Sequence, residues 1–296
     1  MNLHDIPPTS YLLAMNTSYI SQFMATETQI LLGNHLQFMS QHFKALEDSN
    51  SSERRKDLSY ILQLQDDIAI ITVSGILVAD DSWYNRYYGR LSYNEINKAI
   101  FQALEENVSA ILFIFDSPGG DAKLLDDVAE VVSAVNVPTV THASGQCASA
   151  AYFIGMQANY VYCSSMAQVG SIGVYAKVYD QSEWLKKLGV SVERFRTGDL
   201  KGAGDPDFSL SKKEKAYCQE KAEYLAGIFY GMVSDARGIP LQMLLQSEIK
   251  RGGVFIGEQA KAVGLVDNVQ TIDKTMAKVY ELAAKNVDTT SNMRLS

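Results

Sequence analysis

Apolar residues gather in short continuous runs in the middle of the chain, and each run has the length of one buried strand. One run covers residues 68–73 and ends at a Ser-Gly turn. A second run covers 110–115, and a shorter one covers 137–141. Runs that are apolar at successive positions are typical of parallel strands covered on both faces. The pattern therefore predicts a buried sheet built from these segments.

Helical signals alternate with these runs. Ser92 and Glu95 have the spacing of a capping box, which marks the start of a helix. Ser211 and Glu214 form a second such box, and Gly238 ends the helix that follows. The predicted helices cover residues 92–106, 122–135, 211–236 and 272–285. Strands and helices that alternate in this way indicate the α/β class with a parallel sheet.

The chain divides into three predicted segments. Residues 1–66 are polar and rich in Gln and Met with helical spacing, so we expect an N-terminal helical arm and linker. Residues 67–285 carry the strand and helix pattern and form the main domain. Residues 286–296 are polar, and we expect a flexible tail there.

One long segment has no charged side chain. Residues 131–176 contain no Asp, Glu, Lys or Arg, although polar residues interrupt the segment repeatedly. Charged side chains are excluded where water is excluded, so this segment should form the interior of the fold. No stretch reaches the roughly 18 apolar residues that a membrane span needs. The first residues include Asp5 and two prolines, which do not fit a signal peptide, so we expect no membrane anchor.

Composition excludes several functional classes. The 296 residues have a net charge of −8, so the chain lacks the basic surface of a general nucleic-acid binder. Cys147, Cys163 and Cys218 form no metal-binding spacing and cannot all pair. We interpret them as reduced thiols of a cytosolic protein, two of them in the core. The four histidines show no metal spacing either, and no metal or cofactor is implied.

The turn after the second predicted strand is the first candidate for chemistry. Residues 116–121 read Asp-Ser-Pro-Gly-Gly-Asp and precede a helix. Gly119 and Gly120 would let the backbone approach a ligand closely and present N–H groups to it. The turn is either a cradle for an oxyanion or phosphate, or an ordinary tight turn.

Ser149 is the second candidate, because it follows the next predicted strand and lies among alanines. It is either a small core residue or a nucleophile, and a nucleophilic serine needs a base. No histidine follows His142, so the base would be His142 at the preceding strand or a lysine. A lysine acts as a base only when burial favours its neutral form. Lys201, in a glycine-rich loop, is one candidate among several.

The chain resembles the S49 family of serine peptidases, which includes signal peptide peptidase A and phage head-maturation proteases. The resemblance covers about residues 67–270 and rests on four blocks in order, with a weaker fifth. The blocks are Asp-Ser-Pro-Gly-Gly at 116–120, Ala-Ser-Ala-Ala-Tyr at 148–152, Val-Gly-Ser-Ile-Gly-Val at 169–174, Thr-Gly-Asp-Leu-Lys-Gly-Ala-Gly-Asp-Pro at 197–206, and Phe-Ile-Gly-Glu-Gln-Ala at 255–260 with Gly-Leu-Val-Asp at 264–267.

This resemblance implies a ClpP/crotonase-like fold and a Ser–Lys dyad. Ser149 is then the nucleophile, Lys201 the general base, and Ser171 the hydroxyl that orients the lysine. Backbone N–H groups of Gly119 or Gly120 and of Ala150 would form the oxyanion hole, where fixed donors stabilise the developing charge. The uncharged segment would supply the dry surroundings of the dyad.

The resemblance also suggests a biological role. Ser149 is followed by two alanines, where signal peptide peptidases have two glycines, and no anchor is evident. Both features resemble phage and prophage members. The expected protein is a homo-oligomeric ring in the cytoplasm of a bacterium or phage-infected host. It would cleave polypeptides, with capsid, portal or scaffold proteins as partners.

Three alternatives stay open at this point. The first is a signal peptide peptidase that degrades cleaved signal peptides. The second is a crotonase-type acyl-CoA enzyme, because a shared fold does not fix the function. The third is an inactive assembly scaffold. A crotonase has no need of the Ser149–Lys201 dyad, and a scaffold would be indifferent to the loss of Ser149.

Overall fold

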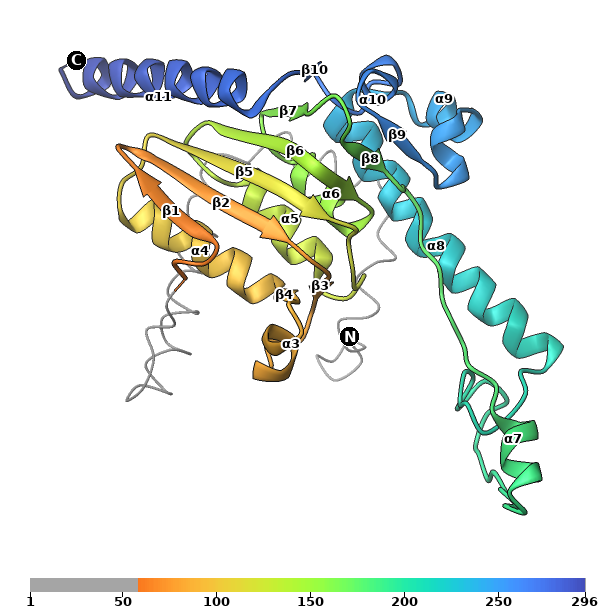
Figure 1. Cartoon of the computed structure of the whole chain (residues 1–296). Coiled ribbons are helices and arrows are strands. Elements are labelled where there is room, and N and C mark those ends of the chain that lie inside the picture. Colours follow the sequence, from red (N-terminus) through yellow and green to blue (C-terminus); the bar gives the residue numbers. More distant parts are fainter. Residues whose placement is uncertain (1–57, 296) are drawn as a thin grey trace, which may run out of the picture. The chain divides into compact units, whose positions relative to one another are not determined.

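The computed structural model describes residues 58–295, of which 58–132 and 137–295 belong to one compact unit (Figure 1). The strands are β1 Leu62–Gln65, β2 Ile68–Ser74, β3 Leu77–Val78, β4 Leu91–Ser92, β5 Ala110–Ser117, β6 Thr139–Ala148, β7 Tyr160–Cys163, β8 Gln168–Gly170, β9 Val254–Ile256 and β10 Asn268–Val269. The helices are α3 Trp83–Tyr87, α4 Tyr93–Glu105, α5 Leu125–Ser133, α6 Ala150–Gly155, α7 Ser182–Lys187, α8 Lys212–Arg237, α9 Leu241–Gln246, α10 Glu258–Ala262 and α11 Ile272–Leu295, with a 3-10 helix η3 at Glu248–Arg251.

A mostly parallel sheet forms the centre of this unit. Its main path runs β1-β2-β5-β6-β7-β10, and every neighbouring pair from β2 to β10 is parallel. β8 pairs with the end of β6, and β9 pairs antiparallel with β8. The predicted α/β class with a parallel sheet is confirmed.

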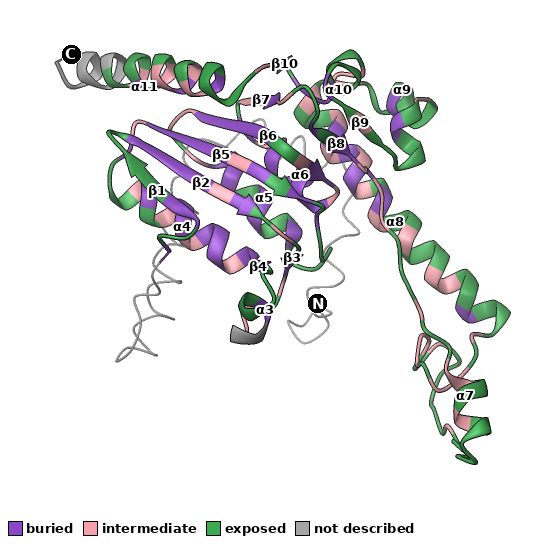
Figure 2. Cartoon of the chain, in the orientation of Figure 1, coloured by how far each residue is buried: buried purple, intermediate pink, exposed green. Residues whose placement is uncertain are grey.

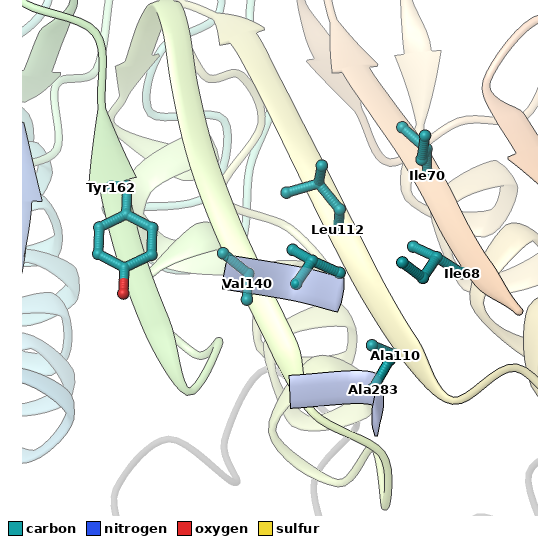
Figure 3. Close-up of a cluster of buried hydrophobic side chains, with 8 residues drawn as sticks. Ile68, Ile70, Ala110, Leu112, Val140, Tyr162 and Ala283 are labelled. Carbon is teal, nitrogen blue, oxygen red and sulfur yellow. The ribbon is translucent and has the colours of Figure 1, made fainter. Parts of the chain in front are cut away.

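Buried apolar side chains cover the face of the sheet on which α11 packs (Figure 3). Alternate residues of a strand point to opposite faces, so Ile68 and Ile70 of β2 share this face with Leu112 of β5. α11 adds Val279 and Ala283 to the cluster. The strand residues between those of the cluster point to the opposite face of the sheet. These residues are apolar too, because helices cover that face as well.

Helices α4 and α6 cover that opposite face, and the central strands between the two helical layers are buried (Figure 2). A Cβ on Gly155 of α6 would lie 3.1 Å from the ring of Phe115 and 3.2 Å from Thr141, so helix and sheet are in close contact. Tyr152 of α6 is fully buried, and its hydroxyl donates to the Leu265 carbonyl at 2.8 Å. The close packing at Gly155 and the hydrogen bond of Tyr152 together hold α6 against the sheet.

Both predicted capping boxes are confirmed. Ser92 accepts from the N–H of Glu95, and Ser211 accepts from the N–H of Glu214, with each glutamate returning a hydrogen bond. The left-handed Gly238 ends α8, as predicted. Cys147 and Cys163 are buried in the sheet, which confirms the two predicted core thiols.

Three boundaries differ from the sequence prediction. β1 pairs with β2, so the sheet begins at Leu62 and not at residue 67. β6 continues through its polar positions to Ala148, because β8 pairs with its far end. The predicted flexible tail continues α11 to Leu295, since no Pro or Gly interrupts residues 286–295. The rest of the predicted arm, residues 1–57, lies outside the described residues.

No helix within residues 58–295 is both long and apolar enough to cross a membrane.

Candidate active site

The candidate residues of the first three blocks gather at one edge of the sheet. The parallel strands β2, β5 and β6 end there, and the residues that follow them form the connecting turns. Ligands in open α/β folds bind at the carboxyl ends of the strands. Gly119 follows β5, Ser149 follows β6, and Ser171 follows β8. The topology therefore places all three turns at the usual binding edge.

Ser149 lies in a strained turn between β6 and α6. Its φ of 53° and ψ of −124° are rare for a residue with a side chain. The Ser149 N–H donates to the Gly170 carbonyl at 2.8 Å, and its carbonyl accepts from Phe153 at 2.9 Å. Its side chain is half-buried and makes no capping hydrogen bond. A strained strand-to-helix turn of this kind presents a nucleophilic hydroxyl in other folds.

Gly119 packs directly against this turn. A Cβ at Gly119 would lie 2.7 Å from the Ala148 carbonyl oxygen and 2.8 Å from the Ser149 Cβ. It would also lie 2.8 Å from the Ala150 nitrogen. Position 119 therefore requires a glycine for two reasons: its φ is 95°, and no Cβ fits this close approach. The structure thus brings the glycine turn, Ser149 and Ala150 together.

The N–H groups in this turn are not equivalent. Gly119 donates its N–H to the Ser117 hydroxyl at 3.1 Å. Gly120 is held against β3, where a Cβ would meet the Leu77 carbonyl oxygen at 1.7 Å. Among the described residues, the Gly120 N–H has no hydrogen-bond acceptor. The Ala150 N–H opens α6 and has no carbonyl partner within that helix. Gly120 and Ala150 are therefore the donors available to an oxyanion.

Ser171 lies beside the nucleophile turn. It follows Gly170, whose carbonyl accepts the Ser149 N–H, and its own N–H donates to Gly253 at 2.8 Å. Ser171 also has a positive φ, of 51°. Two serines with strained backbones therefore occupy adjacent turns, as is common at functional sites. The sequence carried no signal for either conformation.

His142 is not the base for Ser149. It lies within β6, and seven residues at about 3.3 Å each place it roughly 20 Å along the strand from Ser149. Its ring nitrogens contact Thr275 Oγ1 at 2.9 Å and Ser164 Oγ at 3.1 Å. Burial lowers the pKa of His142 to about 4. The histidine is a buried structural residue that connects α11 to the sheet.

Cys147 does not compete with Ser149 as a nucleophile. It is fully buried two residues before Ser149, and burial raises the pKa of its thiol far above the usual range. The thiol therefore stays protonated at neutral pH, and a protonated thiol is a poor nucleophile.

Lys201 is the candidate residue that a single chain does not bring to the site. It is exposed, and its Nζ has no hydrogen-bond partner among residues 58–295. Hydrogen bonds from Arg196 hold the segment that carries Lys201 at the start of α8, because Arg196 donates to both the Lys201 carbonyl and Glu214. α8 meets α6 only further along, where the rings of Phe153 and Phe229 are 5.0 Å apart.

The length of α8 explains this separation. At about 1.5 Å per residue, the helix rises about 22 Å between Glu214 and Phe229. Figure 1 shows the segment with α7 at the end of α8 that is remote from α6. Within one copy of the chain, Lys201 is therefore exposed to water, whereas Ala148 and Ala150 on either side of Ser149 are buried.

No group of three or more His, Cys, Asp or Glu side chains gathers as a metal site within the part of the chain that the structure describes.

Comparison with known proteins identifies the family of the chain. The model of peptidase family S49 matches residues 133–286, which include the Ser149, Ser171 and Lys201 blocks. The chain belongs to peptidase family S49. A Clp protease model matches residues 88–169, and the fold is accordingly ClpP-like. The family and fold predicted from the sequence blocks are confirmed.

Several proteins named as proteases are similar along much of the chain. A protease of Methanocaldococcus jannaschii is 32% identical over 181 residues, which cover 60% of this chain and 58% of the relative. Protease 4 of Salmonella typhi is 29% identical over 73% of this chain and 34% of its own length. Capsid assembly protease C of Escherichia phage lambda is 28% identical over 70% and 47%, respectively. The matches thus span less than two thirds of the length of each of these relatives.

Proposed function

We propose that the protein is a serine endopeptidase in which Ser149 is the nucleophile and Lys201 the general base. The observation that carries this proposal is the strained turn at Ser149, packed against Gly119 beside unpaired N–H donors. A polypeptide carbonyl placed there would meet a nucleophile and an oxyanion hole at once. Membership of a peptidase family supports this reading over that of an acyl-CoA enzyme.

Each residue has a defined task in the proposed reaction. Neutral Lys201 accepts the Ser149 proton while the Ser149 oxygen attacks the peptide carbonyl carbon. The N–H groups of Gly120 and Ala150 stabilise the negative oxygen of the tetrahedral intermediate. Lys201 then protonates the leaving amine, and the C–N bond breaks to give an acyl-enzyme. Water, deprotonated by Lys201, hydrolyses the ester and regenerates Ser149.

We further propose that Lys201 acts on Ser149 of a neighbouring copy. The reason is the distance set by α8, which keeps the two side chains apart within one chain. A lysine needs removal of water to act as a base, and an exposed segment can lose its water by docking on another molecule. This arrangement makes the predicted homo-oligomer a requirement for activity.

The surface of the lysine-bearing segment supports docking on a second copy. Its large apolar side chains are unusually exposed: Tyr175 86%, Tyr179 68%, Trp184 58% and Phe195 90%. Large apolar side chains exposed in numbers on one segment favour an interaction surface. Burial of these side chains between two copies would be favourable through the hydrophobic effect. It would also place Lys201 on the surface of the partner.

The substrate we favour is a capsid or scaffold protein, cleaved in the cytoplasm of a bacterium or an infected host. Two observations support it: the Ser149-Ala150-Ala151 sequence, and the similarity to the capsid assembly protease of phage lambda. Degradation of signal peptides is the second candidate. A signal peptide peptidase of Enterococcus faecium, 26% identical over 68% of the chain, supports it.

Cleavage of labelled casein by the wild type, Ser149→Ala and Lys201→Ala tests the chemistry. We expect activity in the wild type and its loss in both variants. A fluorophosphonate probe that labels wild-type Ser149 would separate a specific protease from an inactive scaffold when casein is not cleaved. Comparing a capsid or scaffold protein with a synthetic signal peptide then distinguishes the two substrate classes.

A further inference from the structure

Glu214 is a buried carboxylate at the start of α8, next to the segment that carries Lys201. Its side chain is only 2% exposed, although most residues around it are accessible to water. Oε1 accepts from Arg196 Nη1 at 2.6 Å and from Arg194 Nη2 at 3.3 Å. Oε2 accepts from the Ser211 N–H at 2.9 Å, in the capping box of the helix.

The two arginines extend from Glu214 to the backbone around Lys201. Arg196 Nη1 also donates to the Lys201 carbonyl at 3.4 Å. Arg194 Nη1 donates to the Gly202 carbonyl at 3.2 Å. Arg194 additionally stacks 4.4 Å above the ring of Phe208, which fixes its guanidinium. One carboxylate, two guanidiniums and two adjacent carbonyls thus form a closed set of contacts, called here the Glu214 clamp.

Residues 197–204 carry Lys201 and are called here the lysine loop. The lysine loop needs such a support because few contacts of its own hold its backbone in place. Gly198, Gly202 and Gly204 all have positive φ, and glycine has the largest conformational freedom to lose on ordering. Apart from short turns within the loop, an ion pair between Asp199 and Lys213 is its other tie to α8. That pair is exposed on both sides, and exposed pairs contribute little.

We propose that Glu214 is a positioning residue for the base: through Arg194 and Arg196, it holds the backbone of Lys201 in the geometry used for proton transfer. This inference rests on the function proposed above. A base displaced by about 1 Å can lose roughly 100-fold in rate. Hydrogen bonds from Ser211 and Arg196 lower the pKa of Glu214 to about 2, so the clamp keeps its charge throughout the working pH range.

The chain offers a matched control in Glu95. Glu95 is also the glutamate of a capping box, is also buried, and also pairs with an arginine, Arg86. It lies at the start of α4 and has no described contact with the lysine loop. Glu214→Gln and Glu95→Gln therefore each remove a buried, arginine-paired charge from a capping box, and only the first breaks the clamp.

The test measures Ser149 labelling by a fluorophosphonate, kcat and KM on casein, and amide hydrogen exchange of residues 197–204. In Glu214→Gln we expect labelling rate and kcat to fall by roughly 10- to 100-fold with little change in KM, and exchange in the loop to rise. Glu214→Asp, which retains the carboxylate, should recover part of the rate. Glu95→Gln should change neither the rate nor the exchange of the loop.

Two contrary results have different meanings. If Lys201→Ala reduces labelling but Glu214→Gln matches Glu95→Gln, the positioning role is wrong and the dyad stands. If Lys201→Ala leaves labelling unchanged, the base assignment fails and the positioning role fails with it.

Discussion

Replacing Gly119 by alanine tests whether the glycine turn and Ser149 form one rigid site. The new Cβ would lie 2.8 Å from the Ser149 Cβ, whereas ordinary contact begins at 3.4 Å. The turn must therefore move away from Ser149 by about 0.6 Å. The Ala148 carbonyl oxygen and the Ala150 nitrogen also lie against the new Cβ and leave little room for this movement. Displacements of about 1 Å cost roughly 100-fold in rate, so we expect kcat to fall by about 10- to 100-fold.

The same substitution also has a stability cost that a control can subtract. An L-residue at positive φ costs about 1–2 kcal/mol, and crowding of a packed site adds about 1–3 kcal/mol. Gly89 also has a positive φ, of 68°, but a Cβ there would meet no atom within 4 Å. Gly89→Ala should therefore show the first cost alone and keep full activity.

Urea unfolding and casein cleavage of the two variants provide the assay. We expect Gly119→Ala to be less stable than Gly89→Ala by about 1–3 kcal/mol and to be the only one that loses activity. Equal stability and equal activity of the two variants would refute the close packing of Gly119 on the nucleophile turn.

Three further predictions concern the scaffold of the site. Because burial lowers the pKa of His142 from 6.5 to about 4, the folded chain binds fewer protons than the unfolded chain between these values. The free energy of unfolding should therefore fall by up to about 3 kcal/mol as the pH drops from 6.5 to 4, and His142→Gln should flatten this slope in urea titrations. Tyr152→Phe leaves the buried Leu265 carbonyl unpaired and should lower the unfolding free energy by about 1–3 kcal/mol in the same assay. Phe229→Ala removes the ring that joins α8 to α6, so thermal unfolding should report a loss of about 3 kcal/mol or more.

Much of the fold was predictable because its signals are local. The apolar runs at 68–73 and 110–115 are β2 and β5, and both capping boxes mark true helix starts. The extension of β6 to Ala148 could not be read from the sequence, since it depends on pairing with β8, which lies some 20 residues further along. Pairings between distant segments leave no local pattern in either strand.

The candidate site was predictable in its residue types but not in its geometry. Gly119, Ser149, Ala150 and Ser171 gather at one edge of the sheet, but the sequence predicted strands only ahead of Gly119 and Ser149, and not β8 ahead of Ser171. The strain at Ser149 and the engaged N–H of Gly119 depend on tertiary contacts, so no sequence pattern reports them.

The position of the base shows a different limit of sequence reasoning. Spacing along the chain places Lys201 in a glycine-rich loop, but the long α8 decides how far that loop lies from α6. Glu214 was visible as a capping residue, whereas its bonds to Arg194 and Arg196 required the folded segment.

The central claim, a dyad completed between copies, is tested most directly by mixing two inactive variants. Ser149→Ala and Lys201→Ala are co-expressed with different tags, purified together, and assayed for casein cleavage. If each site takes Ser149 from one copy and Lys201 from its neighbour, random assembly restores about a quarter of the wild-type activity. If the mixed assembly forms but remains as inactive as either variant alone, the two residues do not act between copies.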